Sequence, residues 1–302
     1  MTSCLAFDLG GSKLVTGLVS REGTVLWKRR VEWSPKSASD VVQALRAEGR
    51  RALLENPHIR PEVIGANIPG LADPANGEWL SASFSGICDV PVAQALSKAF
   101  GLPARADNDG QTCAMAERAF GAGRGVDDFL YLTVSNGVGG GIYSRGRLVR
   151  GAFSGACEIG HVTVVEGGRE CGCGKRGCLE MYAAGPGLSR TYRERTGREA
   201  DGELLARLAR DGDADALFAW RQAGECLGRA IAMAVNVLNP RRVILGGGLS
   251  LAFDLFSPSL HKALQANVFA PPNKYLHVLP TPLGYDGALL GAAALAFSNE
   301  EE

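Results

Sequence analysis

The sequence has no hydrophobic run long enough to cross a membrane. Its longest apolar stretch covers residues 287–297, whereas a helix that spans a bilayer needs about 20 residues. The N-terminal segment has no basic region, and Asp8 breaks its apolar run, so it does not read as a signal peptide. We therefore expect a cytoplasmic protein with no membrane partner.

Neither sign of charge is in excess, because 32 Lys and Arg residues balance 32 Asp and Glu residues. Proteins that bind nucleic acid carry a basic patch or a basic excess, so the balance predicts no nucleic-acid partner. The phosphate-binding motif G-x-x-x-x-G-K-[ST] is also absent. Residues 172–177 formally match the dinucleotide motif G-x-G-x-x-G, but we discard this match because the segment lies in a cysteine cluster rather than after a strand.

The eight cysteines are not spread in the pairs that a secreted disulfide framework would need. Three of them cluster within residues 171–178, and a histidine precedes the cluster. Three thiolates and one imidazole make the closed, tetrahedral set of a structural zinc site. We predict a zinc ion held by His161, Cys171, Cys173 and Cys178. The alternative is a loop of three reduced cysteines without a metal.

Glycine is abundant, with 40 residues, and it gathers where the predicted strands end. Strands are expected at residues 5–9, 14–19 and 25–33, and the order of strand, glycine turn, strand, turn and strand returns from residue 129. This repetition indicates two related α/β domains with a cleft between them, although two ordinary hairpins could show it by coincidence. We assign the smaller domain to residues 1–118 plus a returning helix at 286–302, and the larger domain to residues 119–285.

The first glycine turn has the composition of a phosphate-binding loop. Residues 8–13 read DLGGSK, and the N–H groups of Gly10, Gly11 and Ser12 could surround an anion. Asp8 ends the strand, where its carboxylate could hold Mg²⁺ directly or through water. An ordinary tight hairpin is the alternative explanation.

Polar residues at two further places could bind or activate a hydroxyl group. Asn108 and Asp109 stand at a strand-to-helix junction, where an aspartate could accept a proton or one of the two could simply cap the helix. Glu158 and Glu180 flank the predicted zinc ligands. If His161 binds zinc through one ring nitrogen, the other nitrogen can bind a ligand. Two carboxylates and one imidazole suit a polyhydroxylated ligand; two solvated surface carboxylates are the alternative.

Taken together and in their order along the chain, these motifs resemble those of the ROK family, which comprises repressors, uncharacterised reading frames and sugar kinases. The resemblance covers nearly the whole chain and is carried by residues 8–13, 108–109, 158–161, 171–180, 245–248 and 286–292. It implies an α/β, actin-like (ribonuclease H-like) two-domain sugar kinase fold with an interdomain cleft, as a homodimer or homotetramer. Repressors of the family carry an N-terminal winged-helix domain, for which the first strand leaves no room, so we expect the enzyme branch.

The resemblance also implies the roles of individual residues. Asp109 would be the catalytic base in transfer of the γ-phosphate of ATP to a hexose, at the 6-hydroxyl. The sugar would be bound by Gly70, Ser83, Asn108, Asp109, Glu158, His161 and Glu180. ATP and Mg²⁺ would be bound by Asp8, Gly10, Gly11, Ser12, Lys13, Asn136, Gly137, Gly246 and Gly247.

Three positions depart from the family pattern. Residues 135–137 read SNG where GTG is usual, Ser83 replaces an asparagine, and Cys157 replaces a glycine. These departures predict a hexose other than plain glucose, without naming it. Two other interpretations stay open. One is a sugar sensor without turnover, which the presence of Asp109 disfavours. The other is a kinase for an unusual acceptor, either of the aminosugar type or a non-sugar, the latter disfavoured by the cluster around His161.

Overall fold

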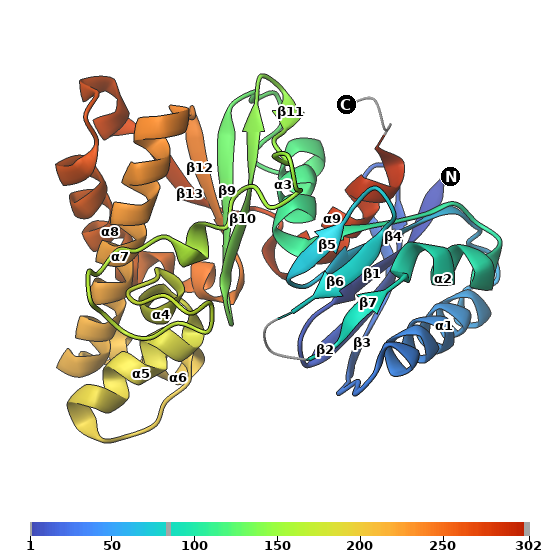
Figure 1. Cartoon of the computed structure of the whole chain (residues 1–302), viewed down its shortest axis with the longest axis horizontal. Helices are drawn as coiled ribbons and strands as arrows, with labels where there is room; N and C mark the ends of the chain where they lie inside the picture. The colour runs from blue at the N-terminus through green and yellow to red at the C-terminus, as the bar shows by residue number, and fades with distance from the viewer. Residues whose placement is uncertain (1, 83–85, 299–302) are drawn as a thin grey trace. The chain divides into compact units, whose positions relative to one another are not determined.

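The computed structural model describes residues 2–82 and 86–298, which fold into two compact units. The first unit consists of the described residues up to Asp127, residues 141–156, and the described residues from Tyr285 onward. The second unit consists of residues 128–140 and 157–284. Figure 1 labels the elements of both. No helix in the described part of the chain is long and apolar enough to cross a membrane.

The first unit is built on a five-stranded sheet with the order β3-β2-β1-β4-β8. Its strands are β1 (Ser3–Leu9), β2 (Lys13–Ser20), β3 (Val25–Glu32), β4 (Pro61–Ile68) and β8 (Ala104–Asn108). The first three pair antiparallel, since the turns that join them are too short for a crossover. Strands β1, β4 and β8 pair parallel, so their carboxyl ends meet at one edge of the sheet. Asp8, Gly70 and Asn108 stand at that edge.

Four helices and a small sheet complete the first unit. The helices are α1 (Ala38–Glu55), α2 (Val92–Phe100), α3 (Asp109–Phe120) and α9 (Gly287–Phe297). The small sheet, with the order β5-β6-β7, consists of β5 (Leu71–Asp73), β6 (Glu78–Ser81) and β7 (Cys88–Val90).

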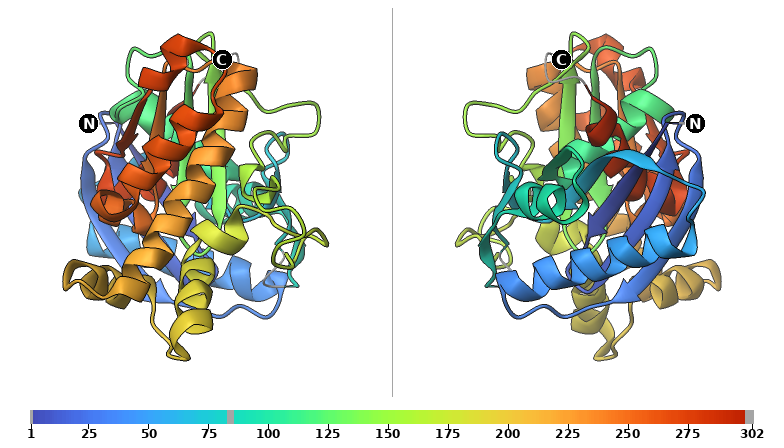
Figure 2. Two further views of the ribbon diagram at one scale, coloured as in Figure 1. Left: turned by 90° about the vertical axis from the view of Figure 1, so that its left-hand side faces the viewer. Right: turned by 90° about the vertical axis from the view of Figure 1, so that its right-hand side faces the viewer.

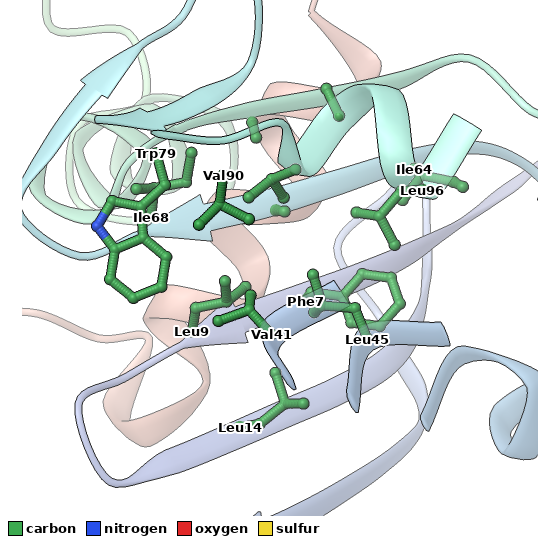
Figure 3. Packing of buried hydrophobic residues seen from close by; sticks show 14 of the residues in the cluster. Phe7, Leu9, Leu14, Val41, Leu45, Ile64, Ile68, Trp79, Val90 and Leu96 are labelled. Atoms are coloured by element: carbon green, nitrogen blue, oxygen red, sulfur yellow. The ribbon is translucent and has the colours of Figure 1, made fainter. Parts of the chain in front are cut away.

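The core of this unit lies under β1 and β4 (Figure 3). Leu5, Phe7 and Leu9 alternate along β1 and therefore share one face, and each is almost completely buried. Val41 and Leu45 of α1 belong to the same buried cluster. Burial of one such side chain stabilises the fold by about 1.5–3 kcal/mol, so this core holds the carboxyl edge of the sheet in place.

A second five-stranded sheet has the order β11-β10-β9-β12-β13. Its strands β9, β12 and β13 belong to the second unit, whereas β11 and most of β10 belong to the first. The strands of this sheet are β9 (Phe129–Val134), β10 (Val138–Ser144), β11 (Arg147–Leu148), β12 (Arg242–Gly246) and β13 (His277–Pro280). β12 pairs parallel with both β9 and β13. The α-helices of the second unit are α4 (Glu180–Ala183), α5 (Gly185–Thr196), α6 (Gly202–Arg210), α7 (Ala214–Leu238) and α8 (Phe253–Asn267). The 3₁₀ turns are η1 (Ile159–His161), η2 (Gly248–Ala252), η3 (Pro271–Tyr275) and η4 (Gly284–Asp286), of which η4 spans the boundary between the two units.

Helices α7 and α8 pack closely against one another, as Figure 2 shows. Two glycines of α7, Gly224 and Gly228, face backbone atoms of α8, where a side chain would collide with the Phe256 and Leu260 carbonyls. Because the two helices approach closely, α7 buries side chains along most of its length, from Ala216 to Val235.

The two sheets share one topological order. In each, the first strand stands at the centre, the next two follow on one side, and two later strands follow on the other side. The repetition predicted from the sequence is therefore present in the structure. Strand β9 ends at Val134 and strand β10 begins at Val138. The second glycine turn therefore consists of residues 135–137.

Candidate functional site

The turn between β1 and β2 carries the first predicted phosphate-binding segment. Gly11, Ser12 and Lys13 are exposed there. The Gly10 N–H group donates to the Lys13 carbonyl at 2.8 Å, so it closes the hairpin and is not available to an anion in this conformation. The Gly10 carbonyl accepts from Trp33 Nε1 at 2.8 Å. The donors that the turn presents to solvent are therefore at Gly11 and Ser12 rather than at Gly10.

Asp8 precedes this turn and is partly buried. Burial raises the pKa of its carboxyl group to about 6, and a hydrogen bond with the Asn67 side chain opposes that rise. Asn67 is itself fully buried on the neighbouring strand, and its Nδ2 donates to the Ala288 carbonyl. A carboxylate in such a low-dielectric position favours a nearby cation, which fits the predicted Mg²⁺ role.

Asn108 and Asp109 stand where β8 passes into α3. Asn108 is the N-cap residue, and its Oδ1 accepts from Gln111 N at 3.1 Å, so the capping role is confirmed. Its Nδ2 donates to the Gly70 carbonyl at 2.8 Å. Asp109 is the first residue of the helix, and its Oδ1 accepts from Gly110 N at 2.8 Å. The positive end of the helix dipole therefore lies beside this carboxyl group.

The residue before Asn108 takes part in an ion pair that the sequence analysis did not predict. Asp107 is 1% exposed and pairs with Arg150, whose Nη1 also donates to Gln111 Oε1 at 3.0 Å. Gln111 Nε2 in turn donates to the Ser154 carbonyl at 2.8 Å. Burial raises the pKa of Asp107, and the positive charge of Arg150 opposes that rise. This network fixes both the β8–α3 junction and the segment that leads to Cys157 and Glu158.

In the second unit, the four predicted metal ligands converge on one point. The ligand atoms of His161, Cys171, Cys173 and Cys178 all lie within 4.8 Å of one another. Cys171 Sγ lies 3.6 Å from His161 Nδ1, and Cys173 Sγ lies 3.6 Å from Cys178 Sγ. A tetrahedral zinc ion with the usual bond lengths sets its ligand atoms about 3.5–3.8 Å apart, so the donor set fits this metal.

The chemistry of the loop supports the same fit. Burial first, and then the neighbouring thiols, raise the pKa of Cys178 to about 12. A divalent cation would reverse this effect, because it stabilises coordinating thiolates. Gly177 has a φ of +77° and contacts the Val165 carbonyl, so only glycine fits between the ligand cysteines at this turn. His161 directs Nδ1 towards Cys171, which leaves Nε2 for another partner.

The second glycine turn lies beside these ligands. Val138 N donates to Glu180 Oε2 at 3.0 Å, and Gly185 N donates to the Ser135 carbonyl at 2.8 Å. Asn136, at the tip of the turn, is exposed. Gly247, with a φ of +81°, packs against the backbone of Val134 just before the turn. The end of β12 and the turn therefore lie next to one another. This proximity is needed if both bind ATP, as the sequence predicts.

The predicted residues fall into two sets, one in each unit. The first unit holds Asp8, Gly10, Gly11, Ser12, Lys13, Gly70, Asn108 and Asp109. The second holds Asn136, Gly137, Glu158, His161, Cys171, Cys173, Cys178, Glu180, Gly246 and Gly247. Glu158 is exposed, at the start of η1. Ser83 lies outside the described residues.

Cys157 adopts a φ of +74°, in the left-handed region that favours glycine. This conformation gives a backbone reason for the glycine that the resemblance leads one to expect at this position. The chain keeps the conformation although it carries a thiol, whose burial raises its pKa to about 12.

Comparison with known proteins places the chain in a family. The profile of the ROK family matches residues 4–299. A glucokinase from Thermotoga maritima is 33% identical over 309 residues, which cover 96% of each chain. An N-acetylmannosamine kinase from Escherichia fergusonii is 31% identical, with 97% of each chain covered.

A solved structure supports the same assignment. The glucokinase from Streptomyces griseus, determined in complex with glucose and AMPPNP, is 30% identical and superposes with a TM-score of 0.87, covering 97% of this chain and 99% of that one. The chain therefore belongs to the ROK family and has its actin-like, ribonuclease H-like two-domain fold.

Proposed function

We propose that this protein is an ATP-dependent hexose kinase that uses Asp109 as its general base. The observation that carries the proposal is the position of Asp109 at the first turn of α3, next to a helix cap that also fixes Gly70. Sugar binding alone needs no base at this position. The similarity to kinases along the whole chain supports a catalytic role rather than a sensing one.

In the proposed reaction, Asp109 accepts the proton of the sugar 6-hydroxyl group while the hydroxyl oxygen attacks the γ-phosphorus of ATP. The bond between this phosphorus and the β,γ-bridging oxygen breaks, and ADP leaves. Donors at Gly11, Ser12 and the turn of residues 135–137 stabilise the charge that develops on the transferred group, where most catalysis of phosphoryl transfer resides. Mg²⁺, with Asp8 nearby, would neutralise part of that charge.

The remaining hydroxyl groups of the sugar are assigned to Asn108, Glu158, His161 and Glu180. Asn108 can still bind a sugar hydroxyl group. Its Oδ1 and Nδ2 can each make a second hydrogen bond besides those to Gln111 and Gly70. His161 would bind zinc through Nδ1 and the sugar through Nε2. The zinc ion, held by His161, Cys171, Cys173 and Cys178, would be structural, since four protein ligands leave no position for a water molecule.

Release of ADP from Mg-ATP across a panel of sugars tests this function. The panel contains glucose, mannose, allose, fructose, N-acetylglucosamine, N-acetylmannosamine and aminohexoses. Strong turnover of one hexose supports the proposal and names the substrate; equal turnover of all of them contradicts the expected selectivity. Sugar binding without turnover of any member would favour the sensor, and neither binding nor turnover would favour a non-sugar acceptor.

A further inference from the structure

Glu180 contacts the second glycine turn directly, which its assigned role in sugar binding does not require. Its Oε2 accepts a hydrogen bond from the backbone N of Val138 at 3.0 Å, across 42 positions of sequence. Gly137, the residue before Val138, has no side chain, and a Cβ atom there would lie 2.7 Å from the same oxygen. The carboxylate therefore lies against the base of the turn.

The position of Glu180 is set by a rigid support. Glu180 opens α4, a single short turn of helix, immediately after Cys178 and Leu179. The Leu179 backbone N donates to the Val162 carbonyl at 3.0 Å. This hydrogen bond ties the start of α4 to the segment that carries His161.

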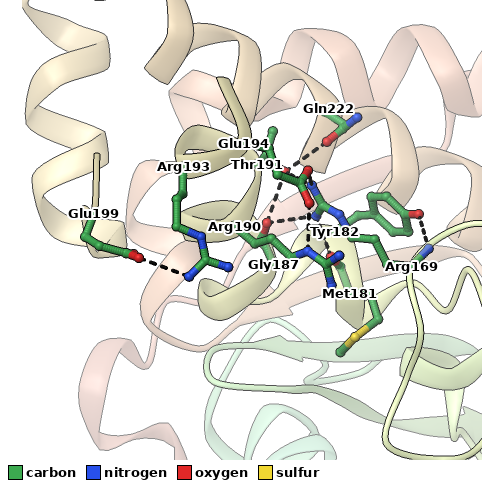
Figure 4. Close-up of polar contacts among 10 residues, drawn as sticks. All are labelled: Arg169, Met181, Tyr182, Gly187, Arg190, Thr191, Arg193, Glu194, Glu199 and Gln222. Carbon is green, nitrogen blue, oxygen red and sulfur yellow. Dashed lines mark hydrogen bonds and ion pairs between the residues drawn. The ribbon is translucent and has the colours of Figure 1, made fainter. Parts of the chain in front are cut away.

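Arg169 holds the other side of α4, as Figure 4 shows. Its Nη1 donates to the carbonyls of Met181 at 2.7 Å and Gly187 at 3.0 Å. Its backbone N donates to the Tyr182 hydroxyl at 2.8 Å, and its guanidinium group lies 4.7 Å from the centre of the Tyr182 ring. Because the Arg169 side chain is only 9% exposed, these contacts are shielded from water. They hold the residues that directly follow Glu180 in the chain.

The opposite side of Val138 is also fixed. Gly160, between Glu158 and His161, packs against the Val138 carbonyl so closely that a side chain would collide with it. Val138 thus lies between the segment of Glu158 and His161 on one side and Glu180 on the other. The residues assigned to the sugar hold the strand that follows the nucleotide turn.

We propose that Glu180 bridges the sugar and nucleotide sites, with one carboxylate oxygen holding the Val138 N–H group and the other accepting a sugar hydroxyl. This inference rests on the proposed function. A carboxylate has about four acceptor positions, so it can make both bonds at once. Glu180 is then a positioning residue for the turn of residues 135–137 as well as a sugar ligand, and a bound sugar fixes the turn that receives the phosphates of ATP.

The test measures AMPPNP binding by calorimetry in the absence of sugar, where a residue that binds only sugar has no effect. Glu180→Ala leaves the Val138 N–H group without its acceptor, and we expect it to weaken AMPPNP binding about tenfold, as loss of a hydrogen bond to a charged group does. Glu180→Gln keeps an acceptor oxygen, and we expect binding within about twofold of the wild type. Glu199→Ala is the control, since it removes an exposed carboxylate of the same unit that pairs with Arg193 and should leave AMPPNP binding unchanged.

Hydrogen exchange of the peptide that contains Val138 gives a second readout that needs no ligand. Exchange should be faster in Glu180→Ala than in Glu180→Gln, with metal content and melting temperature compared to establish that each variant is folded. Unchanged AMPPNP binding and unchanged exchange in Glu180→Ala would overturn the bridge while leaving the kinase proposal intact. A wild-type protein that binds no AMPPNP would instead contradict the proposed function, and the exchange measurement would still decide the role of Glu180 in the turn.

Discussion

Asn108 joins the start of α3 to the turn between β4 and β5, through a 2.8 Å hydrogen bond from its Nδ2 to the Gly70 carbonyl. The same side chain caps the helix that begins with Asp109. One residue therefore positions the proposed base and the backbone segment assigned to the sugar.

Replacing Asn108 by alanine should affect stability and substrate binding together. Loss of an N-cap costs about 1 kcal/mol of unfolding free energy, and loss of the Gly70 contact should raise the KM for sugar. Urea denaturation and steady-state kinetics measure the two effects. The control is Ser37→Ala, which removes the cap of α1 and its 3.2 Å bond from Asp40 N. It should lower stability by a similar amount without changing KM; an equal change in KM would show that the Asn108 effect is merely global.

Removing Arg150 should destabilise the first unit, because it leaves the buried Asp107 carboxylate unpaired. Loss of one partner of a fully buried pair costs about 3–5 kcal/mol. The Arg150 side chain is 34% exposed, so water can partly replace it and we expect about 2 kcal/mol. Denaturant titration measures this. Arg210→Ala, which breaks an exposed pair with Asp254, should change stability little.

The pH dependence of Arg150→Ala follows from the raised pKa of Asp107. Without Arg150 the folded-state pKa rises further above the usual value of 3.8, so the folded protein favours the protonated carboxyl group. The contribution of such a group is fully present below pH 3.8 and is lost as the pH rises through the folded-state pKa. The difference in stability between variant and wild type should therefore shrink on acidification; a difference that grows would contradict the assignment.

Removal of the metal should lower stability and sugar affinity at the same time, because the ligand set includes His161 and leads directly into Glu180. Cys173→Ser, or treatment with a strong zinc chelator, should lower both the melting temperature and the affinity for the substrate hexose. Metal analysis should find about one zinc ion per wild-type chain. The matched control, Cys88→Ser, changes an exposed cysteine outside the cluster and should alter neither quantity. Full stability of a zinc-free wild-type protein would exclude a structural metal.

At Cys157, glycine should be more stable than alanine. The φ of +74° strains every residue with a Cβ atom, at a cost of about 1–2 kcal/mol. Cys157→Ala keeps that strain and loses the thiol, whereas Cys157→Gly loses the thiol but also the strain. We therefore expect the glycine variant to exceed the alanine variant by about 1 kcal/mol in unfolding free energy. The reverse order would mean that the backbone does not hold this conformation in solution.

Much of this structure could be predicted because its signals are local. The strands predicted at residues 5–9, 14–19 and 25–33 correspond to β1, β2 and β3, with bounds that differ by one or two residues. The convergence of three cysteines and a histidine also followed from their spacing. Short strands such as β5 carry too few residues for a periodic pattern.

The missed features are contacts between residues far apart in the chain. Arg150 meets Asp107 across 43 positions, and Val138 meets Glu180 across 42. Neither pair leaves a local pattern, because the fold alone brings its members together. The hydrogen bond that closes the hairpin with Gly10 N was likewise not foreseen, since a glycine-rich segment suits both a free donor and a closed turn.

The role of Asp109 as a general base can be tested by the rate of ADP release by Asp109→Asn, measured at saturating Mg-ATP and saturating concentrations of the preferred hexose. The variant keeps the size of the side chain and an acceptor for Gly110 N, so sugar binding, zinc content and melting temperature should stay near wild-type values. We expect a loss of about 10²–10⁴-fold in turnover, the usual contribution of a general base. Turnover within a few-fold of the wild type, in a variant that is folded and binds sugar, would contradict the role of Asp109.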